Sequence, residues 1–116
     1  MKIHCVYEKL MRGQVASWVK GQKAMMAAIY HAPTAVVWVP FNEAWGQFKT
    51  EKIAEWTKAY DPSRLVNPAS GGNHYRTGDI LDLHKYPAPE LYLYDAQRVT
   101  VLGEFGGIGL PLEGHL

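Results

Sequence analysis

The sequence predicts an α/β fold in which parallel strands alternate with helices. Apolar residues recur at helical spacing in residues 14–30 and again after Thr50, which indicates two amphipathic helices. Between them lies Ala35–Val39, a continuous apolar run rich in β-branched residues and typical of a strand buried on both faces. Strands that alternate with helices favour a parallel sheet with right-handed crossovers. At 116 residues, the chain is expected to form at most one domain.

The helices have recognisable ends. The first is expected from about Gln14 to Tyr30, because Pro33 cannot continue it. The second is expected to begin at Thr50 as the N-cap and to stop at Asp61–Pro62. Its inner face is expected to consist of Ile53, Trp56, Thr57 and Tyr60.

Four strands are expected, and the spacing between them is uneven. They are Ala35–Val39, Arg64–Pro68, Asp79–Tyr86 and Val99–Leu102. The segment between Pro68 and Asp79 begins with a turn-rich Ser-Gly-Gly-Asn run and is too short for a helix with its loops. At least one crossover helix is therefore expected to be absent or shortened.

Charge and hydropathy exclude several classes of protein. The 12 Lys and Arg residues balance 11 Asp and Glu residues, and no basic run occurs, so neither nucleic acid nor an anionic membrane is an expected partner. No segment reaches the ~18 apolar residues that span a bilayer, and the first residues do not form a signal sequence. If the chain is expressed as written, it is expected in the cytoplasm.

No metal or other cofactor is expected. Cys5 is the single cysteine, so neither an internal disulfide nor a cysteine cluster can form. Asn73, His74 and Asp79 carry metal-binding side chains, but their spacing is not that of a ligand set. The four Trp, seven Tyr and three Phe residues are typical of a core and also suit stacking on sugar faces.

Two glutamates follow predicted strands. Glu43 comes shortly after Ala35–Val39, and Glu104 comes after Val99–Leu102. A carboxylate at the carboxyl end of a buried strand is held by a rigid element and faces the mouth of the fold. Two carboxylates are also the minimum equipment for hydrolysis of a glycosidic bond.

The motifs around these glutamates resemble the catalytic barrel of glycoside hydrolase family 2, the β-galactosidase-like enzymes. The matching segments are Trp38–Glu43 (WVPFNE), Leu102–Gly107 (LGEFGG), Asp61–Asn67 (DPSRLVN) and Asp82–Pro87 (DLHKYP). The similarity covers about residues 27–115. It implies a partial (β/α)8 TIM barrel of about four parallel strands, running from the third barrel helix through the seventh strand, with reduced crossover helices.

The resemblance also implies roles for individual residues. Glu43 would be the acid/base, and Glu104 would be the nucleophile. Asn42 would contact the sugar 2-hydroxyl, His84 would line the sugar pocket, and Tyr86 would hydrogen-bond the nucleophile. A retaining mechanism places the two carboxyls about 5–5.5 Å apart, where repulsion between like charges keeps the acid protonated.

Trp45 follows the first glutamate motif and has two interpretations. Its indole either serves as a platform for a sugar ring or packs against the wall of the fold. The first places it in the substrate-binding set, and the second makes it structural.

The sequence thus predicts a retaining β-glycoside hydrolase, an O-glycosyl hydrolase of carbohydrate metabolism, as a fragment of a larger enzyme. The alternative is a non-catalytic remnant or a carbohydrate-binding fragment of such an enzyme. Residues 1–26 would form a poorly matching segment with a barrel helix, and residues 27–116 would carry both carboxylates. The expected partner is a carbohydrate substrate, with self-association or further domains covering the open barrel edges. The residues do not identify the sugar.

Overall fold

The computed structural model describes residues 2–72, 74–107 and 109–114, with side chains from residue 13 onward. By its internal contacts the chain divides into two compact units, Met1–Ala35 and Val36–Leu116. Both glutamates belong to the second unit. In the part of the chain that the structure describes, neither helix combines the length and the apolar character needed to cross a bilayer.

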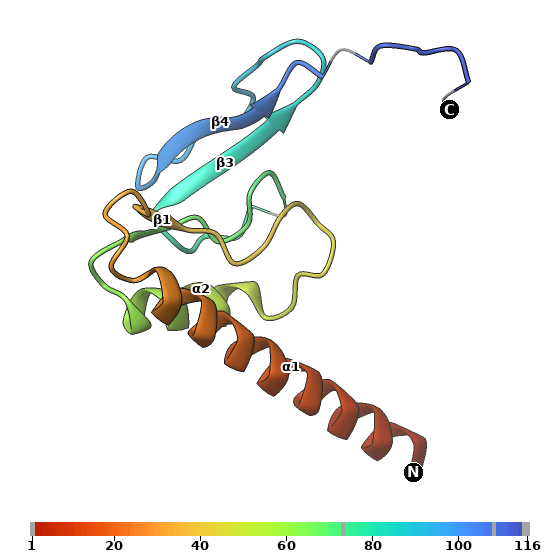
Figure 1. Ribbon diagram of the computed structural model, residues 1–116, viewed down its shortest axis with the longest axis vertical. Helices are drawn as coiled ribbons and strands as arrows, with labels where there is room; N and C mark the ends of the chain where they lie inside the picture. The colour runs from red at the N-terminus through yellow and green to blue at the C-terminus, as the bar shows by residue number, and fades with distance from the viewer. Residues whose placement is uncertain (1, 73, 108, 115–116) are drawn as a thin grey trace. The chain divides into compact units, whose positions relative to one another are not determined.

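The first unit is built on helix α1, Lys2–Ile29 (Figure 1). The helix ends as predicted, with the backbone N–H of Ala32 donating to the Ile29 carbonyl at 3.0 Å just before Pro33. It begins twelve residues earlier than Gln14, the predicted start. Residues 2–13 contain no proline, so the helix extends beyond the stretch in which apolar spacing is regular.

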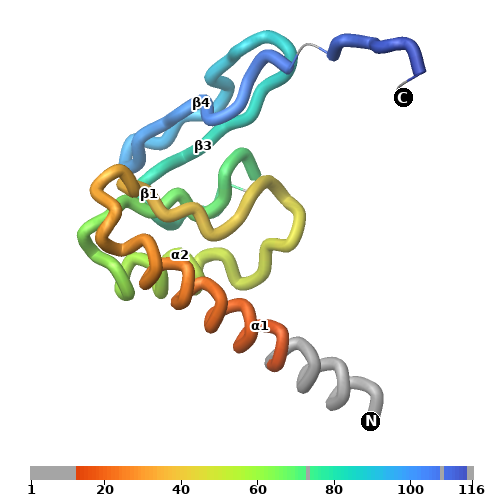
Figure 2. Tube along the Cα trace, viewed as in Figure 1, coloured from red at the N-terminus to blue at the C-terminus, as the bar shows by residue number. Residues whose placement is uncertain are grey.

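The second unit holds the remaining elements (Figure 1). These are β1 (Val37–Trp38), α2 (Thr50–Tyr60), β2 (Leu65–Val66), β3 (Ile80–Lys85) and β4 (Val99–Phe105). Strand β1 pairs with β2, and β3 pairs with β4, each pair being parallel. The tube trace likewise shows β3 and β4 side by side along their length (Figure 2).

The prediction of a four-strand TIM-barrel fragment is wrong. The described residues form two helices and two separate two-stranded sheets. Asp79 gives one physical reason, because its side-chain Oδ2 accepts the Val66 N–H at 2.8 Å and so replaces a backbone partner at the end of β2. Proline is a second reason, since Pro40 and Pro68 follow soon after β1 and β2 and offer no N–H for a longer ladder.

The prediction that no full helix lies between Pro68 and Asp79 is confirmed, and the N-cap prediction is wrong. Apart from Asn73, which lies outside the described residues, the segment 67–79 contains no helix. At the start of α2, Lys49 occupies the N-cap position and makes no side-chain cap bond. The Thr50 hydroxyl instead donates to Gln47 Oε1 at 2.7 Å, because Thr50 already lies inside the helix.

The core of the second unit is apolar and joins α2 to the strands. Its buried apolar side chains are Trp38, Phe41, Ile53, Ala54, Val66, Ala69, Ile80, Leu81 and Leu83. On α2, Ile53 and Thr57 are buried as predicted, whereas Tyr60 is exposed. The end of α2 is tied to β1 because Asp61 accepts hydrogen bonds from Trp38 Nε1 at 2.9 Å and from Arg64 at 2.6 Å. The hydrogen bond from the Ser63 side chain holds the pKa of Asp61 far below its usual range, and the bonds from Arg64 and Trp38 act in the same direction.

Candidate active site

The site is anchored by Asp82, a buried carboxylate on β3. It accepts hydrogen bonds from Asn67 Nδ2 at 2.7 Å, from Ser70 Oγ at 2.8 Å and from the Gly103 backbone N–H at 2.9 Å. A side chain at position 103 would place its Cβ 2.2 Å from Asp82 Oδ1, so only glycine allows this approach. Asp82 thus links β4 and the loop after β2 to β3.

A β-bulge brings His84 and Glu104 together. Leu83 of β3 faces Leu102 of β4, but the next pair is His84 with Glu104, so Gly103 is the extra residue. Without this shift, the partner of His84 would be a residue without a side chain. Because β4 continues to Phe105, Glu104 lies within the last residues of the strand rather than after its end.

Glu43 is held by the loop that follows β1. Its backbone N–H donates to the Ser70 carbonyl at 2.6 Å, and the preceding Asn42 forms a parallel bridge with Ser70. The Gln47 side-chain amide donates to the Glu43 carbonyl. Glu43 has a φ of 49°, in the left-handed region that non-glycine residues rarely adopt. Such a conformation costs on the order of 1–3 kcal/mol and is often found at functional sites.

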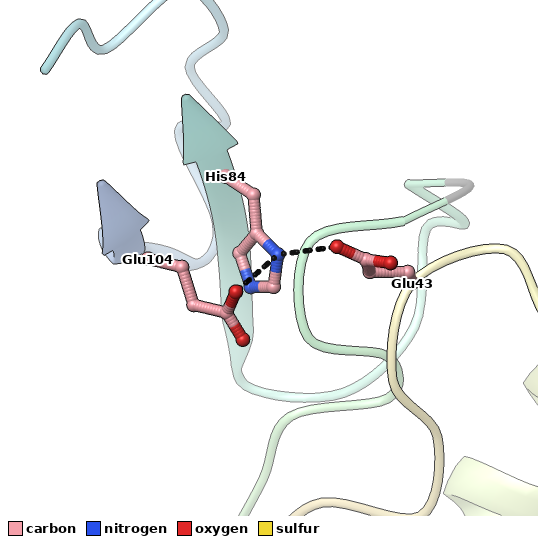
Figure 3. Close-up of side chains that lie close together, drawn as sticks. All are labelled: Glu43, His84 and Glu104. Carbon is pink, nitrogen blue, oxygen red and sulfur yellow. Dashed lines mark hydrogen bonds and ion pairs between the residues drawn. The ribbon is translucent and has the colours of Figure 1, made fainter. Parts of the chain in front are cut away.

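Both glutamates converge on one atom of His84 (Figure 3). His84 Nδ1 lies 3.2 Å from Glu43 Oε1 and 3.4 Å from Glu104 Oε2. One oxygen of each carboxylate and one ring nitrogen of His84 all lie within 4.8 Å of one another. The His84 side chain is only 6% exposed, whereas the two carboxylates are about half exposed, at 50% and 42%. The imidazole therefore forms the floor of the site, and the carboxylates are open to a ligand.

Tyr86 contacts the second carboxylate, as predicted. Its hydroxyl donates a hydrogen bond to Glu104 Oε2. This bond raises the pKa of Tyr86 to about 12, and partial desolvation and the negative charges of Glu104 and Glu43 act in the same direction. The phenol therefore stays a donor to Glu104 throughout the neutral range.

Sequence reasoning missed Ser70 and Asp82. The Ser70 hydroxyl lies 3.0 Å from His84 Nε2, on the side of the ring opposite the carboxylates. Gly71, with a φ of 71°, lies so close that an added Cβ would fall 2.2 Å from the His84 ring. Strand alternation was the available signal, because residues i and i+2 of β3 share one face and this places Asp82 beside His84.

The remaining candidates lie around this group. Asn42 and Trp45 are exposed next to Glu43, and Trp45 is 90% exposed. The interpretation of Trp45 as part of the wall is therefore wrong. The Asp79 carboxylate accepts hydrogen bonds from Lys58 Nζ at 3.2 Å and from the backbone N–H of Val66 in β2. Burial, followed by the positive charge of Arg98, lowers the pKa of His74.

Comparison with protein families and curated proteins found no similar protein. No protein-family model matches the chain, and no curated protein matches its sequence. The similarity to glycoside hydrolases therefore stays a prediction from four motifs. The geometry of the site carries the functional argument.

Proposed function

We propose that the chain is a retaining β-glycoside hydrolase in which Glu43 is the acid/base and Glu104 is the nucleophile. The observation that carries this proposal is the approach of the two carboxylates, each of which has an oxygen within 4.8 Å of an oxygen of the other. Retaining enzymes keep the two carboxyls about 5–5.5 Å apart, whereas inverting enzymes separate them by about 6.5–9.5 Å to admit a water molecule. The spacing here favours the retaining mechanism.

The hydrogen bond from Tyr86 supports Glu104 as the nucleophile. A donor on a carboxylate oxygen stabilises its ionised form, which is the form that attacks. The hydroxyl can play this part because its own pKa is raised to about 12 and it keeps its proton. Glu43 is the carboxyl left to act as acid, and its loop holds it against the same His84 nitrogen that Glu104 contacts.

The reaction then follows two displacements. Glu104 attacks the anomeric carbon as the bond to the leaving oxygen breaks, and Glu43 gives its proton to that oxygen. A water molecule next gives a proton to Glu43 and attacks the same carbon, which releases Glu104 as a carboxylate. Each carboxyl returns to its starting state, and the sugar keeps its anomeric configuration.

Exposed residues beside Glu43 fit a carbohydrate partner. The Asn42 amide offers one donor group and one acceptor to a sugar hydroxyl without adding charge. The exposed indole of Trp45 offers a flat apolar surface to a sugar face. Together with His84 they form the proposed substrate-binding set.

Hydrolysis of a panel of aryl β-glycosides tests the proposal. We expect Glu104→Gln and Glu43→Gln to lower kcat on a responsive substrate by on the order of a thousandfold or more, because each removes a group that acts in the transition state. Glu55→Gln is the matched control, since Glu55 is an exposed glutamate on α2, and it should leave kcat unchanged. Turnover that survives Glu104→Gln contradicts the proposal. Sugar binding without turnover supports instead a non-catalytic, carbohydrate-binding fragment.

A further inference from the structure

The hydrogen-bond chain behind His84 determines which ring nitrogen carries hydrogen. Every described partner of the Asp82 carboxylate is a donor, and one of them is the Ser70 hydroxyl at 2.8 Å. A hydroxyl has a single hydrogen, so Ser70 can only accept at its contact with His84 Nε2, 3.0 Å away. Nε2 therefore carries hydrogen. In the neutral ring, Nδ1 then presents a bare lone pair.

This lone pair points into a group of acceptors. Nδ1 lies 3.2 Å from Glu43 Oε1 and 3.4 Å from Glu104 Oε2, and carboxylate oxygens are acceptors as well (Figure 3). Glu104 Oε2 also accepts from Tyr86, which leaves it a second lone pair. Lone pairs alone repel one another, so a buried imidazole nitrogen that faces two carboxylates favours a cation between them, either a proton or a metal ion.

The geometry points to a divalent transition-metal site formed by Glu43, His84 and Glu104. Zinc binds imidazole nitrogen and carboxylate oxygen at about 2.0–2.2 Å, so the donor atoms of a tetrahedral site lie about 3.3–3.6 Å apart. The two observed nitrogen–oxygen separations, 3.2 and 3.4 Å, are close to this value. The ion is Zn²⁺ rather than Mg²⁺, Ca²⁺ or Mn²⁺, because imidazole suits zinc whereas the other three prefer oxygen ligands.

The surroundings of His84 match those of a metal-binding histidine. Such a residue nearly always donates its second ring N–H to an oxygen, which fixes the ring and makes the free nitrogen a better ligand. Here Ser70 accepts that hydrogen and is itself held by Asp82. The half-exposed carboxylates leave the remaining coordination positions to water.

The metal site has a consequence for the proposed hydrolase. A bound ion would occupy lone pairs that Glu43 and Glu104 need for protonation and attack. Metal and glycoside turnover are therefore mutually exclusive, and Zn²⁺ acts as an inhibitor that a chelator removes. The site itself does not depend on the proposed function, because it rests on the three donor atoms alone.

Titration of the chelator-treated full chain with ZnCl₂ tests the inference by calorimetry. We expect one Zn²⁺ to bind per chain at the site. The same titration with MgCl₂ should show no binding. His84→Ala and Glu43→Gln should each weaken Zn²⁺ binding at least about a hundredfold, and Ser70→Ala about tenfold to a hundredfold. His31→Ala, an exposed histidine of the first unit, should leave the affinity unchanged.

Zinc binding that is absent, or that is unchanged in both His84→Ala and Glu43→Gln, overturns the inference. Circular dichroism checks that each variant is folded, and Glu43→Gln carries the test if His84→Ala does not fold. The two proposals fail separately. Zinc binding through this group, with no hydrolysis by the chelator-treated chain, supports the metal site and contradicts the hydrolase. Hydrolysis by a chain that binds no zinc supports the hydrolase and contradicts the metal site.

Discussion

At the scale of single residues, His84 organises the site. One ring nitrogen contacts both glutamates, and the other contacts Ser70, so four side chains including the imidazole depend on one ring orientation. Gly71 leaves the space in which that ring lies. The site is thus positioned by a buried polar chain behind the carboxylates rather than by the carboxylates themselves.

The Tyr86 phenol carries a prediction about pH. Its pKa is raised from 10.0 to about 12, so the folded chain holds this proton more tightly than the unfolded chain does. The resulting stabilisation is fully present below pH 10 and is lost as the pH rises through about 12. Ultraviolet titration of the tyrosines, with Tyr86→Phe for subtraction, should show one late-ionising phenol. A Tyr86 that ionises near pH 10 contradicts this account.

The same variant has an expected effect on activity. A hydrogen bond to a charged group contributes about 1.5–3 kcal/mol. Tyr86→Phe should therefore lower kcat by roughly tenfold to a hundredfold. Tyr94→Phe is the control, because Tyr94 is an exposed tyrosine of the same unit.

At the scale of elements, the β3–β4 pair is the rigid part of the site. It contributes Asp82 and His84 from one strand and Glu104 from the other, and its bulge sets which residues face each other. Leu83, between the two functional residues of β3, is completely buried. The packing of this one side chain therefore supports both.

Leu83→Ala should lower the free energy of unfolding by about 2–5 kcal/mol, because it removes buried methyl groups and leaves a cavity. Urea denaturation followed by circular dichroism measures this change. Leu91→Ala, at a largely exposed position, should change it by less than about 0.5 kcal/mol. Equal effects of the two substitutions would show that β3 is not packed as described.

The sequence predicted the positions of the elements better than their pairing. Apolar runs and prolines identified all four strands and the end of α2, because those signals are local, whereas the N-cap of α2 was misplaced by one residue. Between the two sheets, the Asp79 side chain takes the Val66 N–H, a contact between residues thirteen positions apart that no local pattern reveals. The bulge at Gly103 could not be predicted either, because it also depends on contacts between residues far apart in the sequence.

The site was partly predictable. Glu43, His84 and Glu104 lie together and Tyr86 bonds Glu104, as expected, but Glu43 comes from a separate sheet, because the loop after β1 is held by the Ser70 carbonyl. Ser70 and Asp82 were not predicted as site residues, because a serine in a turn and an aspartate in an apolar strand have many ordinary roles. Their function is visible only once the hydrogen bonds are known.

At the scale of the whole molecule, the second unit contains every residue of the candidate site. It also exposes large apolar side chains, among them Leu91, Tyr94, Val99, Phe105 and Leu110. Apolar surface of this kind is typical of interfaces. Self-association or contact with further domains stays a prediction.

The most direct test of the central claim is covalent labelling by an activated 2-fluoro β-glycoside that the chain accepts as a substrate. The first displacement forms a bond to the nucleophile, and the fluorine slows the second, so the labelled chain accumulates. Mass spectrometry of the digested protein should place the sugar on Glu104, with no label on the Glu104→Gln variant. A label on another residue, or hydrolysis without any labelled intermediate, would contradict the account.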